Sequence, residues 1–190
     1  KALFILLLLI SQIESFSQID TIFYENNKLK IKGIGKLSDT VKVGFWTEWH
    51  LNGEKASEGL YKLGKPDGYW QNWDSLGRIA GQINWKVGIK EGAIKIWNYD
   101  KNEYVVASYK NDNMHGLFAL YTIDTKNKIV TGTFNNGVME GSWSTYFPNG
   151  NIQSKGEYKN GKAVGKFIIY KEDGSIDIIK NFDQSTPETE

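Results

Sequence analysis

The sequence predicts an all-β protein, an elongated and twisted antiparallel single-sheet meander of stacked β-hairpin repeats. Three observations support this prediction: a recurring glycine, large apolar side chains at fixed distances after it, and turn residues between them. The chain has 190 residues, of which 14% are aromatic and 20 are glycine. This composition favours strands and turns over helices. No residue is cysteine, which excludes disulfides, thiolate metal sites and a cysteine nucleophile.

Each repeat begins with a glycine that recurs every 24 residues, or 25 in one case. A fixed period between about 20 and 50 residues indicates a repeat architecture. The glycines are Gly44, Gly68, Gly92, Gly116, Gly141 and Gly165. We therefore expect six repeats within residues 44–182, each with a structural glycine at its start.

Three large side chains follow each glycine at fixed positions. The first, two residues on, is Trp46, Trp70, Ile94, Phe118, Trp143 or Phe167. The second, five residues on, is always aromatic and forms the row Trp49, Trp73, Trp97, Tyr121, Tyr146 and Tyr170. The third closes the repeat as Tyr61, Trp85, Tyr109, Phe134, Tyr158 or Phe182. Because every repeat matches at all three positions, chance does not explain the pattern.

Turn residues separate the second and third of these positions. Asn52-Gly53 is a dipeptide typical of a two-residue type I′ hairpin turn. A second turn joins successive repeats, as in residues 64–68, where glycine supplies a positive φ and Pro66 sets a turn angle. Each repeat is thus expected to read strand, tight turn, strand, turn, and the six together form about twelve strands.

A type I′ turn centred on residues 52 and 53 fixes the register of the first hairpin. It places Trp46 opposite Gly59 and Gly44 opposite Tyr61. An aromatic ring over a cross-strand glycine covers backbone that would otherwise be exposed. We therefore expect the glycines and the aromatic residues to form one packing device.

The spacing within the first strand leaves two alternatives open. Trp46 and Trp49 are three residues apart, which in a regular strand sends them to opposite faces. Either a bulge lies between them and both rings join one core, or the sheet carries a second aromatic row on its other face. The second row is accordingly the candidate ligand-binding site: exposure would favour glycan binding, and burial would favour a protein-binding scaffold.

Two repeats resemble the bacterial variant of MORN (membrane occupation and recognition nexus) repeats, namely GSWSTYFPNGNIQSKGEYKNGKAVG (residues 141–165) and GFWTEWHLNGEKASEGLYKLGKPDG (residues 44–68). The resemblance implies an elongated, twisted single sheet. It also implies a protein-interaction and dimerisation scaffold. Separately, the sequence contains no G-x-S-x-G nucleophile motif and no phosphate-binding loop, so no enzymatic activity and no cofactor are expected. Similar sequences carry an antitoxin label.

The third and fourth repeats depart from this pattern. Lys101 and Thr125 stand where the turn glycine belongs, and one extra residue lies between Tyr121 and Phe134. We expect longer or different turns in these two hairpins.

Both ends of the chain differ from the repeats. Residues 1–17 read as a secretory signal peptide, because their apolar run is far shorter than the ~20 residues of a membrane-spanning helix. Residues 18–43 are expected to form N-terminal strands, a degenerate repeat acting as a cap. The tail, residues 183–190, has no apolar residue and is expected to be disordered.

Residues capable of catalysis or metal binding are sparse. The net charge of +1 gives no basic surface for nucleic acid. His50 and His115 occupy different repeat positions, so a structural or solvated role is expected and no metal site. Asp67, Glu91 and Glu140 share one repeat position and are expected to line a solvated edge rather than an active site.

The sequence therefore predicts a non-enzymatic repeat scaffold that mediates protein–protein interaction at the bacterial cell envelope. Its partner would be another protein or a second copy, in a homodimer formed through edge strands. Export would leave it periplasmic, on the cell surface or secreted, with no transmembrane segment in the mature chain. The alternative is an envelope glycan-binding module that uses the second aromatic row. A weaker alternative is an antitoxin, against which the signal peptide argues.

Overall fold

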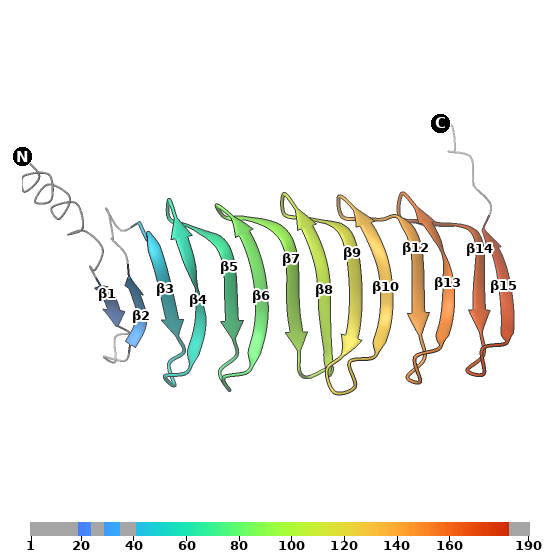
Figure 1. Ribbon diagram of the computed structural model, residues 1–190, viewed down its shortest axis with the longest axis horizontal. Coiled ribbons are helices and arrows are strands. Elements are labelled where there is room, and N and C mark those ends of the chain that lie inside the picture. Colours follow the sequence, from blue (N-terminus) through green and yellow to red (C-terminus); the bar gives the residue numbers. More distant parts are fainter. Residues whose placement is uncertain (1–18, 24–28, 35–40, 183–190) are drawn as a thin grey trace, which may run out of the picture. The chain divides into compact units, whose positions relative to one another are not determined.

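The computed structural model describes residues 19–23, 29–34 and 41–182 (Figure 1). Every regular element in this part of the chain is a β-strand, and the strands follow chain order in an antiparallel sheet. The predicted all-β single-sheet meander of hairpin repeats is confirmed. The signal peptide predicted for residues 1–17 and the tail predicted for residues 183–190 lie outside the described residues.

The chain divides into two compact units, called unit 1 and unit 2 below. Unit 1 contains the described residues up to Ala80, together with Trp85–Gly88. Its strands are β1 (Ile19–Phe23), β2 (Leu29–Ile34), β3 (Gly44–Trp49), β4 (Lys55–Lys62) and β5 (Lys65–Trp73). Each of these strands pairs antiparallel with the next.

Unit 2 contains Gly81–Asn84 and the described residues from Ile89 onwards, so β6 (Ile79–Lys86) contributes to both units. Its other strands are β7 (Ile89–Asn98), β8 (Glu103–Lys110), β9 (Asn113–Thr122), β10 (Lys128–Asn135), β11 (Val138–Met139), β12 (Gly141–Tyr146), β13 (Ile152–Lys159), β14 (Lys162–Tyr170) and β15 (Ile176–Phe182). The short β11 pairs with the end of β10, and β12 continues the sheet beside it.

The turn inside the first repeat differs from the prediction, although the predicted register is correct. His50 N–H donates to the Glu54 carbonyl at 2.8 Å, which closes a three-residue loop that ends in Gly53 with φ 94°. This loop has one residue more than a type I′ turn. A bulge on β4, where Ala56 has no partner on β3, offsets the extra residue. Trp46 therefore still pairs with Gly59.

Type I′ turns occur instead between successive repeats. Lys62 pairs with Lys65, and the two residues between them, Leu63 and Gly64, have φ values of 52° and 74°. Two positive φ values define this turn, whose twist matches that of the flanking strands. Pro66 lies in β5 opposite Tyr61, so the prediction that it sets a turn angle is wrong.

The third and fourth repeats have longer loops, as predicted. The pair Asn98–Glu103 encloses four residues. In the fourth repeat, the hydrogen bond from Thr122 N–H to the Asn127 carbonyl (3.0 Å) also encloses four. Both loops replace glycine by a non-glycine residue in the left-handed region, Asn102 (φ 55°) and Lys126 (φ 57°).

The repeat glycines mark a second bulge, between one repeat and the next. From β4 to β5 the pairing shifts from Glu58–Gln71 to Leu60–Asp67, so β5 carries two extra residues where Gly68 lies. Gly68 has a φ of 72°, a backbone conformation that is strained for residues with a side chain. All six repeat glycines adopt it: Gly44 (89°), Gly68 (72°), Gly92 (90°), Gly116 (98°), Gly141 (74°) and Gly165 (64°).

The first and third large positions of the repeats, called the packing row, form the core of each unit, except Phe182, which is 38% exposed. Trp46 is fully buried and Trp70 is 5% exposed. Neighbouring rings pack edge to face, as in Tyr61–Trp70 in unit 1 (4.9 Å between centroids, 86°) and Phe134–Trp143 in unit 2 (5.2 Å, 87°). Such pairs add stabilisation beyond the area they bury.

In the first, fourth and fifth repeats, the glycine that faces the packing ring is covered by a ring of the following repeat. Gly59 pairs with Trp46, but a Cβ built on Gly59 would lie 2.4 Å from the indole of Trp70. Gly156 is covered in the same way by Phe167. The predicted device is therefore present, and each glycine accommodates rings from two repeats.

Candidate functional site

The second aromatic row lies on the opposite face from the packing row. In β3 no extra residue separates Trp46 from Trp49, because the bulge is at Ala56 on the partner strand. Regular alternation therefore sends the two rings to opposite faces. In unit 2 the same arrangement holds in β12, where the unpaired residue is Gln153 on β13. Of the two alternatives that the sequence left open, the structure therefore shows the one in which the sheet carries an aromatic row on each face.

Every ring of the second row is half-buried. This holds for Trp49 and Trp73 in unit 1, and for Trp97, Tyr121, Tyr146 and Tyr170 in unit 2. The row is thus neither the fully exposed surface expected for glycan stacking nor a closed core. Its role as the binding site stays a prediction.

Lysine side chains lie over these rings. In unit 1, Lys55 Nζ is 4.8 Å from the ring centroid of Trp73. In unit 2, Lys95 Nζ is 5.6 Å from Trp97, Lys128 Nζ is 5.8 Å from Tyr146 and Lys155 Nζ is 5.5 Å from Tyr170. An ammonium at such distances is attracted by the ring, and the lysine stem covers apolar surface while its charge stays in water.

Tyr104 joins this row in unit 2, although the repeat pattern did not predict it. It pairs with Trp97 and lies between that ring (6.0 Å between centroids, 22°) and Tyr121 (4.9 Å, 10°). Lys95 Nζ lies 5.4 Å from its ring. Partial burial, and to a lesser degree Tyr121, raise the pKa of Tyr104, so its hydroxyl keeps its proton at neutral pH. Below, the lysine-capped face means Trp97, Tyr104, Tyr121, Tyr146 and Tyr170 with Lys95, Lys128 and Lys155.

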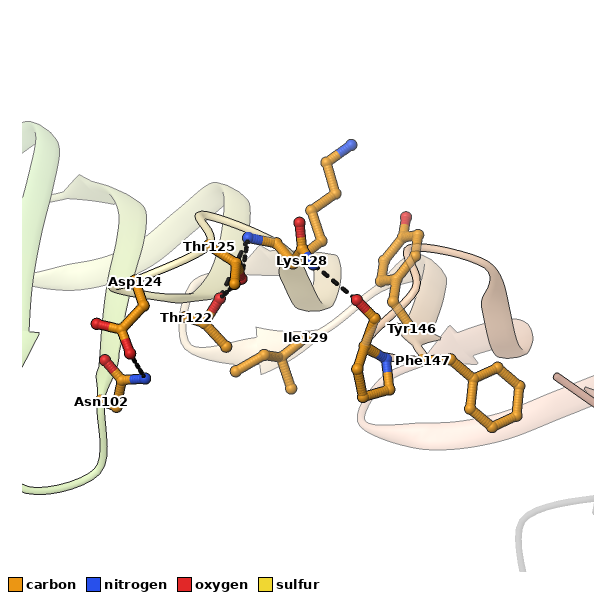
Figure 2. Close-up of a pocket in the computed structure, with 10 residues that line it drawn as sticks. Asn102, Thr122, Asp124, Thr125, Lys128, Ile129, Tyr146 and Phe147 are labelled. Atoms are coloured by element: carbon orange, nitrogen blue, oxygen red, sulfur yellow. Dashed lines mark hydrogen bonds between the residues drawn. The ribbon is translucent and has the colours of Figure 1, made fainter.

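A shallow hollow of about 280 Å³ adjoins this face in unit 2 (Figure 2). Tyr146 lies at one end of it, Asn102 and Asp124 lie at the other, and Lys128 lies between them with its ammonium group pointing away from the hollow. Asn102 Nδ2 donates to Asp124 Oδ2 at 2.8 Å, which fixes both side chains. The loop that lines the hollow is in the fourth repeat, the one with the extra residue.

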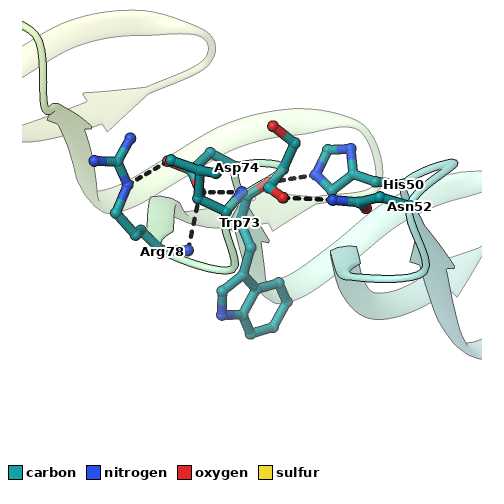
Figure 3. Close-up of polar contacts among 7 residues, drawn as sticks. His50, Asn52, Trp73, Asp74 and Arg78 are labelled. Carbon is teal, nitrogen blue, oxygen red and sulfur yellow. Dashed lines mark hydrogen bonds and ion pairs between the residues drawn. The ribbon is translucent and has the colours of Figure 1, made fainter.

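The loop ends in unit 1 are held by polar contacts (Figure 3). His50 Nε2 lies 3.0 Å from the Trp73 carbonyl, to which it donates, and Asn52 Nδ2 donates to the Ser75 carbonyl at 2.6 Å. His50 therefore has a structural contact between successive repeats.

Asp74 organises the loop that these contacts reach. Partial desolvation acts to raise the pKa of its carboxyl, but hydrogen bonds from Arg78 and Leu76 outweigh it and lower the pKa. Its Oδ2 accepts from Arg78 Nε at 2.7 Å, and its Oδ1 accepts from the backbone N–H groups of Leu76 and Arg78.

The carboxylates at the shared repeat position also hold turns, a role that the sequence did not predict. Each accepts a hydrogen bond from the first residue of the type I′ turn one repeat later: Asp67 from Val87 (2.9 Å), Glu91 from Asn111 (3.1 Å) and Glu140 from Asn160 (2.8 Å).

His115 occupies the same position in the fourth repeat. Within the described part of the chain its buried Nδ1 has no hydrogen-bond partner. No group of three or more His, Asp or Glu residues in that part is placed to hold a metal ion, and none of its segments is a helix able to span a membrane.

Comparison with known proteins places one repeat in a family. Residues 139–160, which contain β12, its loop and β13, match the model of the MORN repeat variant. A search of curated proteins finds no match. The fold defines the class of protein, a scaffold of antiparallel β-hairpin repeats, and the repeat at residues 139–160 is similar to the MORN repeat variant.

Proposed function

We propose that this protein is a non-enzymatic scaffold that binds another protein through the edge of β15, at the bacterial cell envelope. The observation that carries the proposal is the exposure of this strand. β15 ends the strand order, and every one of its residues is exposed. Ile176, Ile178 and Ile179 are 55%, 45% and 49% exposed.

An open edge strand offers backbone N–H and C=O groups to another chain. Partners that add a strand to such an edge gain main-chain hydrogen bonds, and neighbouring apolar side chains give specificity. The exposed isoleucines of β15 supply that second component. A second copy of the chain is one partner that this edge suits.

A non-enzymatic role agrees with how the polar side chains are used. The three carboxylates at the shared repeat position hold turns of the following repeat, and His50 links two loops. The three carboxylates and His50 therefore have structural roles in the fold. The apolar run within residues 1–17 supports export.

The experiment compares the full chain with an Ile178→Lys/Ile179→Lys variant in affinity capture from envelope extracts and in sedimentation velocity. Lysines on an edge strand oppose pairing, so the variant should lose the captured protein or the self-association. Leu63→Lys, at a turn residue that is 75% exposed, is the matched control and should behave as the wild type. Equal capture and equal self-association by all three proteins would contradict the edge as the binding site.

Location is tested separately by fractionating cells that express the full chain. We expect the protein in the envelope or the medium. A protein found entirely in the cytoplasm would refute the envelope part of the proposal.

A further inference from the structure

We propose that the lysine-capped face of unit 2 binds an acidic polysaccharide, with lysines on the carboxylates and aromatic rings against the sugars. This site is separate from the edge of β15 and involves a different class of ligand. The contacts that carry it are those of Lys95, Lys128 and Lys155 with their rings.

Lys95, Lys128 and Lys155 form no ion pair among the described residues. The ion pairs found among the described residues involve Lys42, Lys55 and Arg78, all in unit 1. The lysines of the lysine-capped face therefore carry positive charge that no carboxylate in that part of the chain neutralises at close range. Charge complementarity favours an anionic ligand.

The aromatic rings allow the lysine-capped face to distinguish an anionic polysaccharide from other anions. Tyr146 and Tyr170 lie in strands two positions apart in the sheet. Two strand spacings are about 10 Å, which is close to the length of a disaccharide. A polysaccharide with one carboxylate per sugar or per disaccharide can therefore meet successive rings and lysines along one chain.

Lysine position favours an acidic sugar over a neutral one. A neutral sugar that stacks on Tyr146 or Tyr170 must displace the lysine that lies over that ring. An acidic sugar can keep the ammonium as the partner of its carboxylate while its C–H groups contact the exposed part of the ring.

The hollow beside Tyr146 provides a place for one sugar ring. Lys128 lies at its rim, where the ammonium group can pair with a carboxylate outside the hollow, and the Asn102–Asp124 end offers amide and carboxylate oxygens to hydroxyl groups (Figure 2). Ile129 and Pro148 add apolar surface to the lining. Sites of this kind combine an apolar lining with a few polar groups that fix orientation.

The test is calorimetric titration of the full chain with an alginate oligosaccharide, which carries one carboxylate per sugar. A cello-oligosaccharide of the same length is the neutral probe, oligoglutamate is the anion without sugar rings, and oligothymidylate is the nucleic-acid probe. We expect alginate to bind and the other three to bind at least tenfold more weakly. Equal or tighter binding of any one of them would overturn the proposal.

Variants locate the site. Replacing Lys95, Lys128 and Lys155 by Gln should weaken alginate binding about tenfold or more, because each exposed ion pair contributes up to a few-fold in affinity. Tyr146→Ser should weaken alginate binding while leaving the residual binding of oligoglutamate unchanged. An unchanged alginate affinity in either variant would refute the assignment.

A matched control variant loses the same charge through the same type of substitution at other positions. Replacing Lys110, Lys159 and Lys162 by Gln removes the same charge beside the type I′ turns, at the strand ends remote from the hairpin loops, and should leave alginate binding as in the wild type. A loss as large as that of the first triple variant would show that only net charge matters, which contradicts the proposal. The Ile178→Lys/Ile179→Lys variant separates this site from the proposed protein-binding edge, because it should retain alginate binding.

Discussion

Gly156 shows how closely single residues determine the packing in unit 2. It pairs with Trp143 on one side, and on the other the ring of Phe167 lies where a side chain would be. A Cβ at this position would be 2.3 Å from a ring atom, far inside van der Waals contact. The ring therefore has to move if any side chain is introduced.

We expect Gly156→Ala to lower the free energy of unfolding by about 3 kcal/mol, the upper part of the range for overpacking. Urea denaturation measures the change. Ser142→Ala, an exposed strand residue, should change stability by less than about 0.5 kcal/mol. Combining Gly156→Ala with Phe167→Leu should cost less than the sum of the single changes, since both alter one contact. Strict additivity would show that the ring is not the cause.

His115 occupies a repeat position at which carboxylates elsewhere hold the turns between repeats. Glu91 and Glu140 occupy its position in neighbouring repeats and accept a backbone N–H, whereas the Nδ1 of His115 is buried with no partner in the described structure. We expect His115→Glu to stabilise the protein by about 1 kcal/mol, through a hydrogen bond to a charged acceptor. The melting temperature should rise accordingly.

Val164 provides the control for this prediction. It occupies the same position in the last repeat, where the described chain has no later turn for a carboxylate to hold. Val164→Glu should therefore give no stabilisation. An equal gain at both positions would indicate a general charge effect instead of a specific hydrogen bond.

At the scale of the element, the type I′ turns contain residues of unequal suitability. Asn160 and Leu63 both hold a left-handed conformation at the first turn position, each with φ 52°. Asparagine tolerates this conformation far better than leucine. Since Leu63 is 75% exposed, its replacement sacrifices little apolar burial.

We expect Leu63→Asn to raise the free energy of unfolding by about 1 kcal/mol. The reciprocal change, Asn160→Leu, should lower it by a similar amount. Both values come from denaturant titrations of otherwise identical chains. Stabilisation by both substitutions would contradict the conformational explanation.

The hairpins also show what the sequence can and cannot predict about an element. The pairing of Trp46 with Gly59 could be predicted because glycine and ring recur at fixed spacings. The turn type could not, because a three-residue loop with a bulge at Ala56 gives the same pairing as a two-residue turn. The extra loop residue and the bulge compensate each other, so the spacing of the rings in the sequence is the same with both as with neither.

The candidate site was predictable to a similar extent. Its rings follow the repeat, so all six positions could be named in advance. Lys95, Lys128 and Lys155 lie at different distances from their repeat glycines, so no periodic signal marks them, and their contacts depend on which neighbouring strand they reach. Tyr104 was missed for the same reason.

At the scale of the whole molecule, each unit is a row of repeats in which rings contact their nearest neighbours. Trp143, for example, packs against Phe118, Phe134 and Tyr158. Stability in such arrays is approximately a sum of repeat and nearest-neighbour contributions. A destabilising substitution in one repeat should therefore affect that repeat and its nearest neighbours only.

We expect Trp143→Ala to reduce the hydrogen-exchange protection of amides in β10, β12 and β13, while amides in β7 and β8 keep their wild-type protection. Mass spectrometry of exchanged peptides measures this. Uniform loss of protection throughout unit 2 would indicate that the unit unfolds as one cooperative block.

Loops of three and of four residues occur at the same hairpin position, and the ring pairings are kept in both cases, as Gly44–Tyr61 and Gly92–Tyr109 show. Loop length and core geometry are thus largely independent of each other. These loops should accept grafted peptide segments, so that one scaffold could display several epitopes in a fixed order. Chain length could then vary among descendants of such a protein without any change in its interior.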